Sequence, residues 1–282
     1  MNTNITKKVQ RYEIDILQQI ARICKKHGIE YFGIGGTALG AVRHKGFVPW
    51  DDDIDVGMAR KDYEMFLSVA EKELPPGYHV QNFYTEPNSP FYFTKIRKDN
   101  TKFVEYYLRD YKMHQGIFVD IFPFDNIPDQ PWIQKIHFKV SRLLYQLFLC
   151  KSLKTVCSSR FELQGEYKKT YKHYVRKIVH YLLYPIPKKW LFYSMDRCVR
   201  LFNHKETRKM GHIVRKRLNV SKQNLYPILF LDFDTIQMPV PNNYDAYLKN
   251  QFGDYMAMPP KDKRYGHLPY LVEFEDGGSE EC

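Results

Sequence analysis

Apolar side chains recur every three or four residues near the start of the chain. They are Val9, Tyr12, Ile16, Ile20 and Ile23. Because this spacing places them on one face of a helix, we expect a helix over 7–27, ended by Gly28. A second amphipathic pattern predicts a helix over 60–74, which stops before Pro75 and Pro76.

Short apolar runs between glycine, proline and polar clusters predict strands. The expected strands cover residues 29–33, 54–58, 78–83, 91–97, 102–106 and 116–125. A short helix is expected over 37–43, and the segment 98–101, Lys-Asp-Asn-Thr, predicts a hairpin turn between two of these strands. After residue 227 the chain returns to mixed structure with a helix over 244–251, and the acidic residues 273–282 are expected to be frayed.

The segment 131–217 differs from its surroundings, because it is rich in Lys, Arg, Tyr and Leu and contains few acids. Its helical spacing predicts two to four helices. The apolar positions singled out are Phe138, Leu143, Leu144, Leu147 and Phe148, which lie among Lys135, Lys139, Arg142 and Lys151. One interpretation is an amphipathic surface that lies on an anionic membrane. The other is an ordinary helical subdomain whose apolar stripe is core.

Composition narrows the class of protein. The 282 residues are 44% hydrophobic and 16% aromatic, which is enough for a substantial core, and the formal net charge of +11 suggests an anionic partner or simply a soluble basic protein. Five scattered cysteines form no CxxC pair, which is typical of reduced thiols in a cytosolic protein. Because we find neither an apolar leader nor a run of about 18 uncharged apolar residues, we expect no membrane span.

Four aspartates lie within five positions, after a glycine-rich turn. They are Asp51, Asp52, Asp53 and Asp55. Clustered carboxylates repel one another, and these flank Ile54 and Val56, so an exposed acidic turn explains them poorly. Mg²⁺ or Mn²⁺ prefers such oxygen ligands. Asp53 and Asp55 alternate along the predicted strand and should point to the same side. Asp51 and Asp52 could take part in the site, or could face solvent or cap a backbone N–H.

Two further features point to phosphoryl transfer. Gly35 and Gly36 precede a predicted helix, whose free N–H groups could face a phosphate. Asp120 lies in the middle of the apolar strand over 116–125, where a carboxylate needs either a function or a structural hydrogen bond. Three carboxylates around one or two Mg²⁺ ions could clamp the attacking and leaving oxygens of a transferred phosphoryl group.

This order of features resembles the nucleotidyltransferase fold, and longer runs resemble the LicD family. These runs are Gly36-Thr-Ala-Leu-Gly-Ala-Val-Arg43, Gly46-Phe-Val-Pro-Trp-Asp-Asp-Asp-Ile-Asp55 and Gly116-Ile-Phe-Val-Asp-Ile-Phe-Pro-Phe-Asp125. The segment 240–260, which includes Phe252-Gly-Asp-Tyr-Met256 and Pro259-Pro260, is also similar to that family. The resemblance implies an α/β (α+β) fold: a nucleotidyltransferase-like mixed sheet flanked by helices, with a basic helical insertion.

The resemblance also implies roles for single residues. Asp53, Asp55 and Asp120 should be catalytic and hold Mg²⁺ or Mn²⁺, with Asp51 as a further metal ligand and Asp120 also a candidate base for the acceptor hydroxyl. The expected donor phosphate-binding residues are Gly35, Gly36, Thr37, Arg43 and His44. His44 could equally be an exposed loop histidine.

The family is known for moving phosphocholine from CDP-choline to a hydroxyl of a cell-surface glycan. We therefore expect a CDP-alcohol donor and a glycan acceptor that could be lipid-linked, such as a lipopolysaccharide, teichoic acid or capsule precursor. The alternatives are transfer of ribitol or glycerol phosphate, or a nucleotidyltransferase that attaches NMP. A nucleic-acid-binding module and an inactive scaffold explain the aspartates less well, and we expect no nucleic-acid partner.

The predicted organisation has three parts. Residues 1–130 form a nucleotidyltransferase-like catalytic core, 131–220 a basic helical subdomain, and 221–282 a segment that completes the catalytic domain. We expect a cytoplasmic protein, with peripheral contact to the inner face of the membrane as one interpretation of the basic helices.

Overall fold

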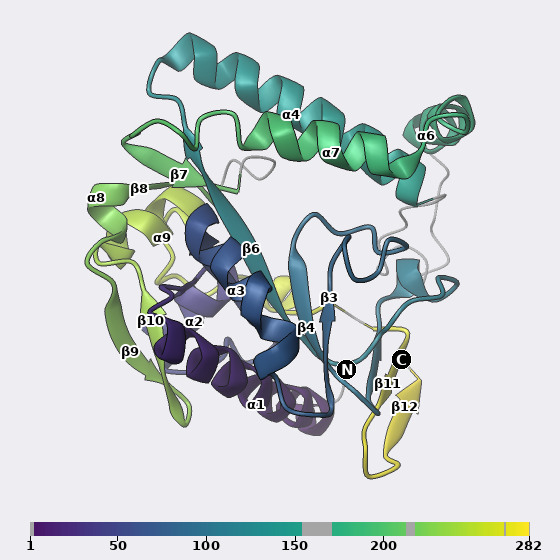
Figure 1. The fold of residues 1–282 in the computed structure, drawn as a ribbon. Coiled ribbons are helices and arrows are strands. Elements are labelled where there is room, and N and C mark those ends of the chain that lie inside the picture. Colours follow the sequence, from purple (N-terminus) through teal and green to yellow (C-terminus); the bar gives the residue numbers. More distant parts are fainter. Residues whose placement is uncertain (1–2, 154–170, 213–217, 268, 282) are drawn as a thin grey trace.

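The computed structural model describes residues 3–153, 171–212, 218–267 and 269–281 (Figure 1). Both long helices expected in the first part of the chain are confirmed: α1 covers Thr3–His27 and α3 covers Arg60–Glu73. In α1 the residues Val9, Ile16, Ile20 and Ile23 of the apolar pattern are buried and Tyr12 is partly buried, while Tyr63, Phe66 and Ala70 are buried on α3.

A mixed sheet lies at the centre of the molecule. Its main path runs through β1 (Phe32–Gly33), β2 (Asp55–Ala59), β6 (Phe118–Ile127), β4 (Thr94–Lys98) and β3 (Tyr78–Gln81). The end of β6 also pairs with β7 (Lys209–Gly211), which pairs with β8 (Val220–Ser221), so the described residues form a seven-stranded sheet. β2 runs parallel to β6, and β6 runs antiparallel to β4 and β7.

Helices cover both faces of this sheet. On one face α1 and α3 pack over Val119 and Ile121 of β6. On the other face α2 (Gly35–His44) and α9 (Tyr244–Phe252) contribute to a second cluster that contains Phe122. Because successive residues of a strand point to opposite faces, Asp120 lies on the same face as Phe122, away from α1. The predicted fold class, a mixed sheet flanked by helices, is confirmed.

Three further helices form a layer along one edge of the molecule (Figure 1). They are α4 (Pro131–Ser152), α6 (Tyr171–Leu182) and α7 (Lys188–Val199). α4 and α7 lie side by side, and the ring of Phe148 on α4 packs against Phe192 on α7 and Phe83 near the sheet. These three helices agree with the two to four predicted for the basic segment 131–217. Residues 154–170 and 213–217 of this segment lie outside the described residues.

β5 (Lys102–Val104) corrects two predictions. It does not form a hairpin with β4, because β4 is already flanked by β6 and β3 and has no free edge. Instead, β5 pairs with β11 (Leu271–Glu273), which pairs with β12 (Ser279–Glu281). The expectation that residues 273–282 are frayed is therefore wrong for the residues through 281.

The remaining elements complete the side of the molecule near α2. α8 (Lys222–Leu225) precedes an antiparallel hairpin of β9 (Leu229–Phe233) and β10 (Ile236–Val240), and the helix expected over 244–251 is present as α9. Short 3₁₀ helices occur at Tyr106–Leu108 (η1) and Lys261–Lys263 (η3).

Candidate active site

The parallel pairing of β2 with β6 brings two of the predicted acids together. Asp55 lies directly opposite Asp120 in this register, and the Asp120 N–H donates to the Ile54 carbonyl at 2.9 Å. Asp53 precedes β2, and all three carboxylates line one cavity of about 330 Å³. The sequence pattern thus led to three acids that share a cavity, whereas their role as metal ligands stays a prediction.

The glycine turn stands next to these acids at the beginning of α2. Gly35 has a φ of 55°, a left-handed conformation that side chains other than glycine rarely adopt. A Cβ atom on Gly36 would lie 2.3 Å from Asp51 Oδ2, so only glycine leaves room for that carboxylate. The Thr37 hydroxyl accepts a 2.8 Å hydrogen bond from the Asp55 N–H, which ties α2 to the first residue of β2.

Lys95 on β4 is the buried partner of Asp120. Its Nζ lies 2.8 and 3.0 Å from the two carboxylate oxygens and 3.3 Å from the centre of the Phe118 ring. Burial raises the pKa of Asp120 to about 6, although the Lys95 ammonium opposes this change and Glu105 adds to it. Asp120 is therefore a buried carboxylate, paired with Lys95, whose pKa lies closer to neutral pH than that of an ordinary aspartate.

Asp52 has a different role from its neighbours, because it holds His267. Its buried carboxylate accepts from the His267 backbone N–H at 2.9 Å and lies 2.9 Å from the ring Nδ1. The other ring nitrogen, Nε2, lies 3.7 Å from Asp53 Oδ2. Burial by itself would lower the pKa of His267, but the charges of Asp53 and Asp52 outweigh it and hold the pKa well above its ordinary value.

Potential ligands for a divalent cation gather around the loop before β2. Asp52, Asp53 and His267 each offer an atom within 4.8 Å of the others, but Asp52 and His267 are paired with each other. Asp53 with the other acids of the cavity, Asp55 and Asp120, is therefore the set that suits a cation.

Glu13 of α1 lies close to Asp52 and Asp53, is 1% exposed, and its Oε2 has no hydrogen-bond partner among the described residues. Burial and the neighbouring aspartates raise the pKa of Glu13 well above normal, and burial with Asp53 does the same for Asp51. A bound cation would relieve this repulsion.

Arg43 and His44 lie at the other end of α2 from the glycine turn. Arg43 Nη1 donates to the carbonyls of Tyr255 at 2.7 Å and Ala257 at 3.3 Å, and its Nε donates to His44 Nε2. Neither side chain belongs to the residues described as lining the cavity with the acids. In this arrangement Arg43 fastens the segment after α9, and its contact with a donor phosphate stays a prediction.

Four residues that the sequence did not single out line the same cavity. They are Glu105, Tyr107, Tyr145 and Arg176. Arg176 comes from α6, and its Nε and Nη2 are buried without a hydrogen-bond partner among the described residues. The Tyr107 hydroxyl donates to Glu105 Oε1 at 3.3 Å, whereas Glu105 Oε2 is buried without such a partner in the described part of the chain. No local motif marks these residues, because three separate segments contribute them: the stretch after β5, α4 and α6.

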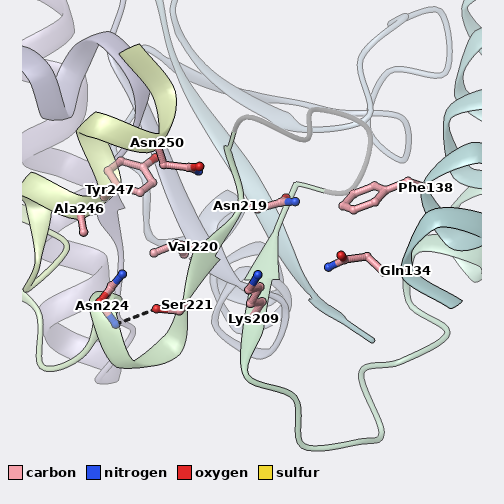
Figure 2. A pocket seen from close by; sticks show the side chains of 10 residues that line it. All are labelled: Gln134, Phe138, Lys209, Asn219, Val220, Ser221, Asn224, Ala246, Tyr247 and Asn250. Atoms are coloured by element: carbon pink, nitrogen blue, oxygen red, sulfur yellow. Dashed lines mark hydrogen bonds between the residues drawn. The ribbon is translucent and has the colours of Figure 1, made fainter. Parts of the chain in front are cut away.

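A second cleft of similar volume has other chemistry (Figure 2). Between α4 and α9 it is lined by four side-chain amides, together with Ser221, Lys209 and Phe138. The amides belong to Gln134, Asn219, Asn224 and Asn250. No carboxylate is among its described lining residues, so this cleft is unsuited to a metal. The acid-lined cavity is therefore the candidate active site.

Comparison with known proteins agrees with this geometry. The family model described as "LicD/FKTN/FKRP, nucleotidyltransferase domain" matches residues 28–146, which include the glycine turn and the three acids of the cavity. The chain is also 27% identical over 260 residues to the lipopolysaccharide cholinephosphotransferase LicD of Haemophilus influenzae, with 90% of this chain and 92% of that protein covered. Residues 28–146 are a domain of the LicD family.

Two shorter matches concern other bacteria. An uncharacterized protein of Rickettsia typhi is 31% identical over 84 residues, which cover 27% of each protein. One from Rickettsia prowazekii is 40% identical over 47 residues, or 17% of this chain and 18% of that protein. The LicD family model ends at residue 146, so it does not reach Arg176 or His267, which complete the cavity.

Proposed function

We propose that this protein, whose residues 28–146 are a LicD family domain, is a metal-dependent phosphotransferase that moves phosphocholine from CDP-choline to a hydroxyl of a cell-surface glycan. The single observation that carries the proposal is the cavity in which Asp53, Asp55 and Asp120 meet beside the beginning of α2. The name of the Haemophilus relative, a lipopolysaccharide cholinephosphotransferase, supports the type of transfer and the kind of acceptor.

Each residue of the cavity has a task in this proposal. Asp53, Asp55 and Asp120, with Asp51 beside them, would hold Mg²⁺ or Mn²⁺, which supplies charge neutralisation on the diphosphate. Asp52 keeps His267 against Asp53. Of the residues so assigned, Asp55 and Asp120 lie on the paired strands β2 and β6, and Asp51 and Asp53 lie on the loop before β2.

The transfer itself is an in-line displacement at the phosphorus that carries the alcohol. The acceptor oxygen forms a bond to this phosphorus, the bond to the bridging oxygen breaks, and CMP leaves with the electron pair. Asp120 takes the proton of the acceptor hydroxyl, a task suited to a carboxylate whose pKa is raised to about 6. Arg176 would contact the phosphate oxygens through its buried, unpartnered N–H groups.

Another group of residues that line the cavity suits a cationic head group. Glu105 has a buried carboxylate oxygen without a partner among the described residues, and Tyr107 and Tyr145 line the cavity near it. A carboxylate with aromatic rings suits a quaternary ammonium. Lys95 already occupies the rings of Phe91, Phe93 and Phe118, so these are not available to choline.

Substitution of the metal-binding acids tests the proposal. Asp53→Asn and Asp55→Asn should each reduce CMP release from CDP-choline by about 100-fold or more, because the charges that hold the metal are lost. The matched control is Asp110→Asn, whose carboxylate is 84% exposed and which should retain normal turnover. Thermal unfolding should show that the Asp53 variant is folded, since the substitution also removes repulsion from Asp51.

The products separate the alternatives. Transfer of the phospho-alcohol releases CMP, whereas attachment of NMP releases pyrophosphate. CDP-choline, CDP-ribitol and CDP-glycerol, each tested with Mg²⁺ and a candidate glycan, identify the head group. Near-normal turnover of either active-site variant in the presence of metal would contradict the site assignment, and pyrophosphate release would favour the nucleotidyltransferase.

A further inference from the structure

α4 carries two apolar faces, of which one is exposed. Phe138, Leu144, Leu147 and Phe148 pack into the cluster shared with α7, as expected for a core stripe. The same helix carries a second stripe, spaced by four, four and three residues, that is exposed. Its members and their exposed fractions are Trp132 67%, Ile136 54%, Val140 42% and Leu143 59%. The packed residues agree with the core interpretation of this segment, and the exposed stripe is the part to which the membrane interpretation applies.

α6, which packs against α4, carries exposed apolar residues of its own. Val175, Ile178 and Leu182 lie three and four residues apart on α6 and are 52%, 59% and 71% exposed. Single exposed apolar residues are ordinary, but stripes of this kind on two neighbouring helices mark an interaction site. We call the stripes on these two helices the apolar edge.

Basic side chains flank the apolar edge, and acids are absent from both helices. Lys135, Lys139 and Arg142 are exposed on α4, and Lys177 is exposed on α6. Neither α4 nor α6 contains an aspartate or glutamate. An apolar face bordered by Lys and Arg is the pattern of a helix that lies in the interface of an anionic bilayer.

We propose that the apolar edge docks the protein onto an anionic lipid bilayer. Among the described residues, no helix is long and apolar enough to cross a membrane, so the contact is peripheral. A second copy of this chain fits the surface less well, because a symmetric contact would bring the same basic side chains face to face without acids to pair with them.

Docking here would serve the proposed function, on which this part of the inference rests. Tyr145, Gln146 and Leu149 of α4 and Arg176 of α6 line the acid-containing cavity. The helices that meet the bilayer are thus the ones that border the active site. A glycan acceptor attached to a lipid could then enter the cavity beside α4 while its lipid stays in the bilayer.

Vesicle sedimentation tests the docking. The full chain should sediment with vesicles of phosphatidylglycerol and phosphatidylcholine in equal parts, and much less with pure phosphatidylcholine. Binding should weaken as salt is added, because the Lys and Arg contribution is screened. Equal binding to both vesicle types, or none to the anionic ones, would overturn the proposal.

A double variant locates the contact. Ile136→Ser combined with Leu143→Ser should lower the vesicle partition coefficient by about tenfold or more, because two apolar side chains no longer enter the bilayer. Phe230→Ser is the matched control, since Phe230 is 64% exposed on β9, far from α4 in Figure 1, and it should bind like the unchanged protein. Unchanged binding by the double variant would refute this surface.

Two readouts keep the docking separate from catalysis and self-association. The double variant should release CMP at the normal rate with a water-soluble acceptor, because it changes no cavity residue. If no CDP-alcohol is turned over while anionic vesicles still bind through this surface, the proposed function fails and the docking stands. Light scattering should give a monomer, and a dimer that the double variant disrupts, without vesicle binding, would identify a second copy as the occupant.

Discussion

The four clustered aspartates differ in what their carboxylates contact. Asp55 faces Asp120 across two paired strands, and Asp53 stands next to His267. Asp52 is fully engaged with His267, and Asp51 packs against Gly36. The four aspartates carry the same charge but make different contacts, because the backbone directs each side chain toward a different neighbour.

Substitution of two arginines, one at a time, tests where the donor phosphate binds. Arg176→Met should raise the KM for the CDP-alcohol by about tenfold, because a charge-assisted contact to phosphate is lost. Arg43→Met is the matched control and should leave this KM unchanged, since Arg43 donates to backbone carbonyls at the other end of α2. Initial rates over a range of donor concentrations measure both. The reverse result would return the phosphate site to the residues expected from the sequence.

Sequence patterns identify those site residues that a local pattern marks. Asp53 and Asp55 are found from strand alternation, and Asp120 from its place in an apolar run. His267 cannot be found in this way, since 215 positions separate it from Asp52 and only the folded chain brings them together. Arg176 looks like any other cation of a basic helix until its burial beside the acids is known.

At the scale of elements, β6 joins the catalytic half of the sheet to the helical layer. Its first part carries Asp120, and its last part carries Asp125, which forms a bidentate ion pair with Arg60 of α3 at 2.8 and 2.7 Å. Asn203, which follows α7, donates to the same carboxylate at 2.6 Å. This buried pair therefore fixes the position of α3 and of the chain after α7 relative to β6.

Loss of this ion pair should be costly. Asp125→Ala should lower the free energy of unfolding by about 3–5 kcal/mol, because it leaves the Arg60 guanidinium buried without its carboxylate. Lys102→Ala, which breaks an exposed pair with Glu273, should cost less than about 1 kcal/mol. Urea unfolding measures both. Similar values for the two variants would contradict a structural role for the buried pair.

Lys188 at the beginning of α7 makes stability depend on pH. Its Nζ donates to the carbonyls of Pro87 and Ser89 at 2.8 Å each, and burial lowers its pKa from 10.5 to about 8. Between about pH 8 and pH 10.5 the Lys188 side chain keeps its proton in the unfolded chain and has released it in the folded protein. The contribution of Lys188 to the free energy of unfolding therefore increases as pH rises.

Comparison with Lys188→Met isolates this effect from other titrating groups. The free energy of unfolding of the unchanged protein should improve relative to the variant by about 1–2 kcal/mol between neutral pH and about pH 10, with allowance for partial solvent screening. Urea unfolding at both pH values provides the difference. A constant difference would mean that Lys188 titrates normally in the folded protein.

Prediction of elements fails where pairing is decided by distant strands. The turn near Asn100 is real, with a φ of 57°, but the strands on either side of it separate because β3 and β6 already occupy both edges of β4. The acidic C-terminal segment looks unstructured in sequence and yet forms β11 and β12, since β5 supplies an edge for them. The pattern of apolar residues indicates where a strand lies in the sequence, but it does not indicate which other strand it pairs with.

At the scale of the whole molecule, the cavity draws on every part of the chain. The acids come from the region predicted as the catalytic core, Tyr145 and Arg176 from the helical segment, and His267 from the C-terminal segment. The predicted division at residues 130 and 220 stays a prediction, but β7, which falls inside the middle part, and β8, which crosses its end, join the central sheet. The helical layer is therefore attached to the sheet by strands as well as by side-chain packing.

The ends of the described chain lie next to each other (Figure 1). Lys8 forms an ion pair with Asp276, and the ring of Tyr12 stacks on Phe274 at 5.7 Å. These contacts hold β11 against α1, close to the segment that carries His267. The position of the histidine in the cavity thus depends on contacts outside the cavity.

The contact between Asp52 and His267 has a consequence for folding kinetics. Closing a loop of this length costs more conformational entropy than forming α1 or the pairing of neighbouring strands, and contacts of high sequence separation form slowly. We expect the sheet and helices to assemble first. The contact of His267 with Asp52 in the loop before β2 should form near the end of folding. A chain still emerging from the ribosome would then carry the aspartates without their finished environment, and catalytic competence would be the last property the molecule acquires.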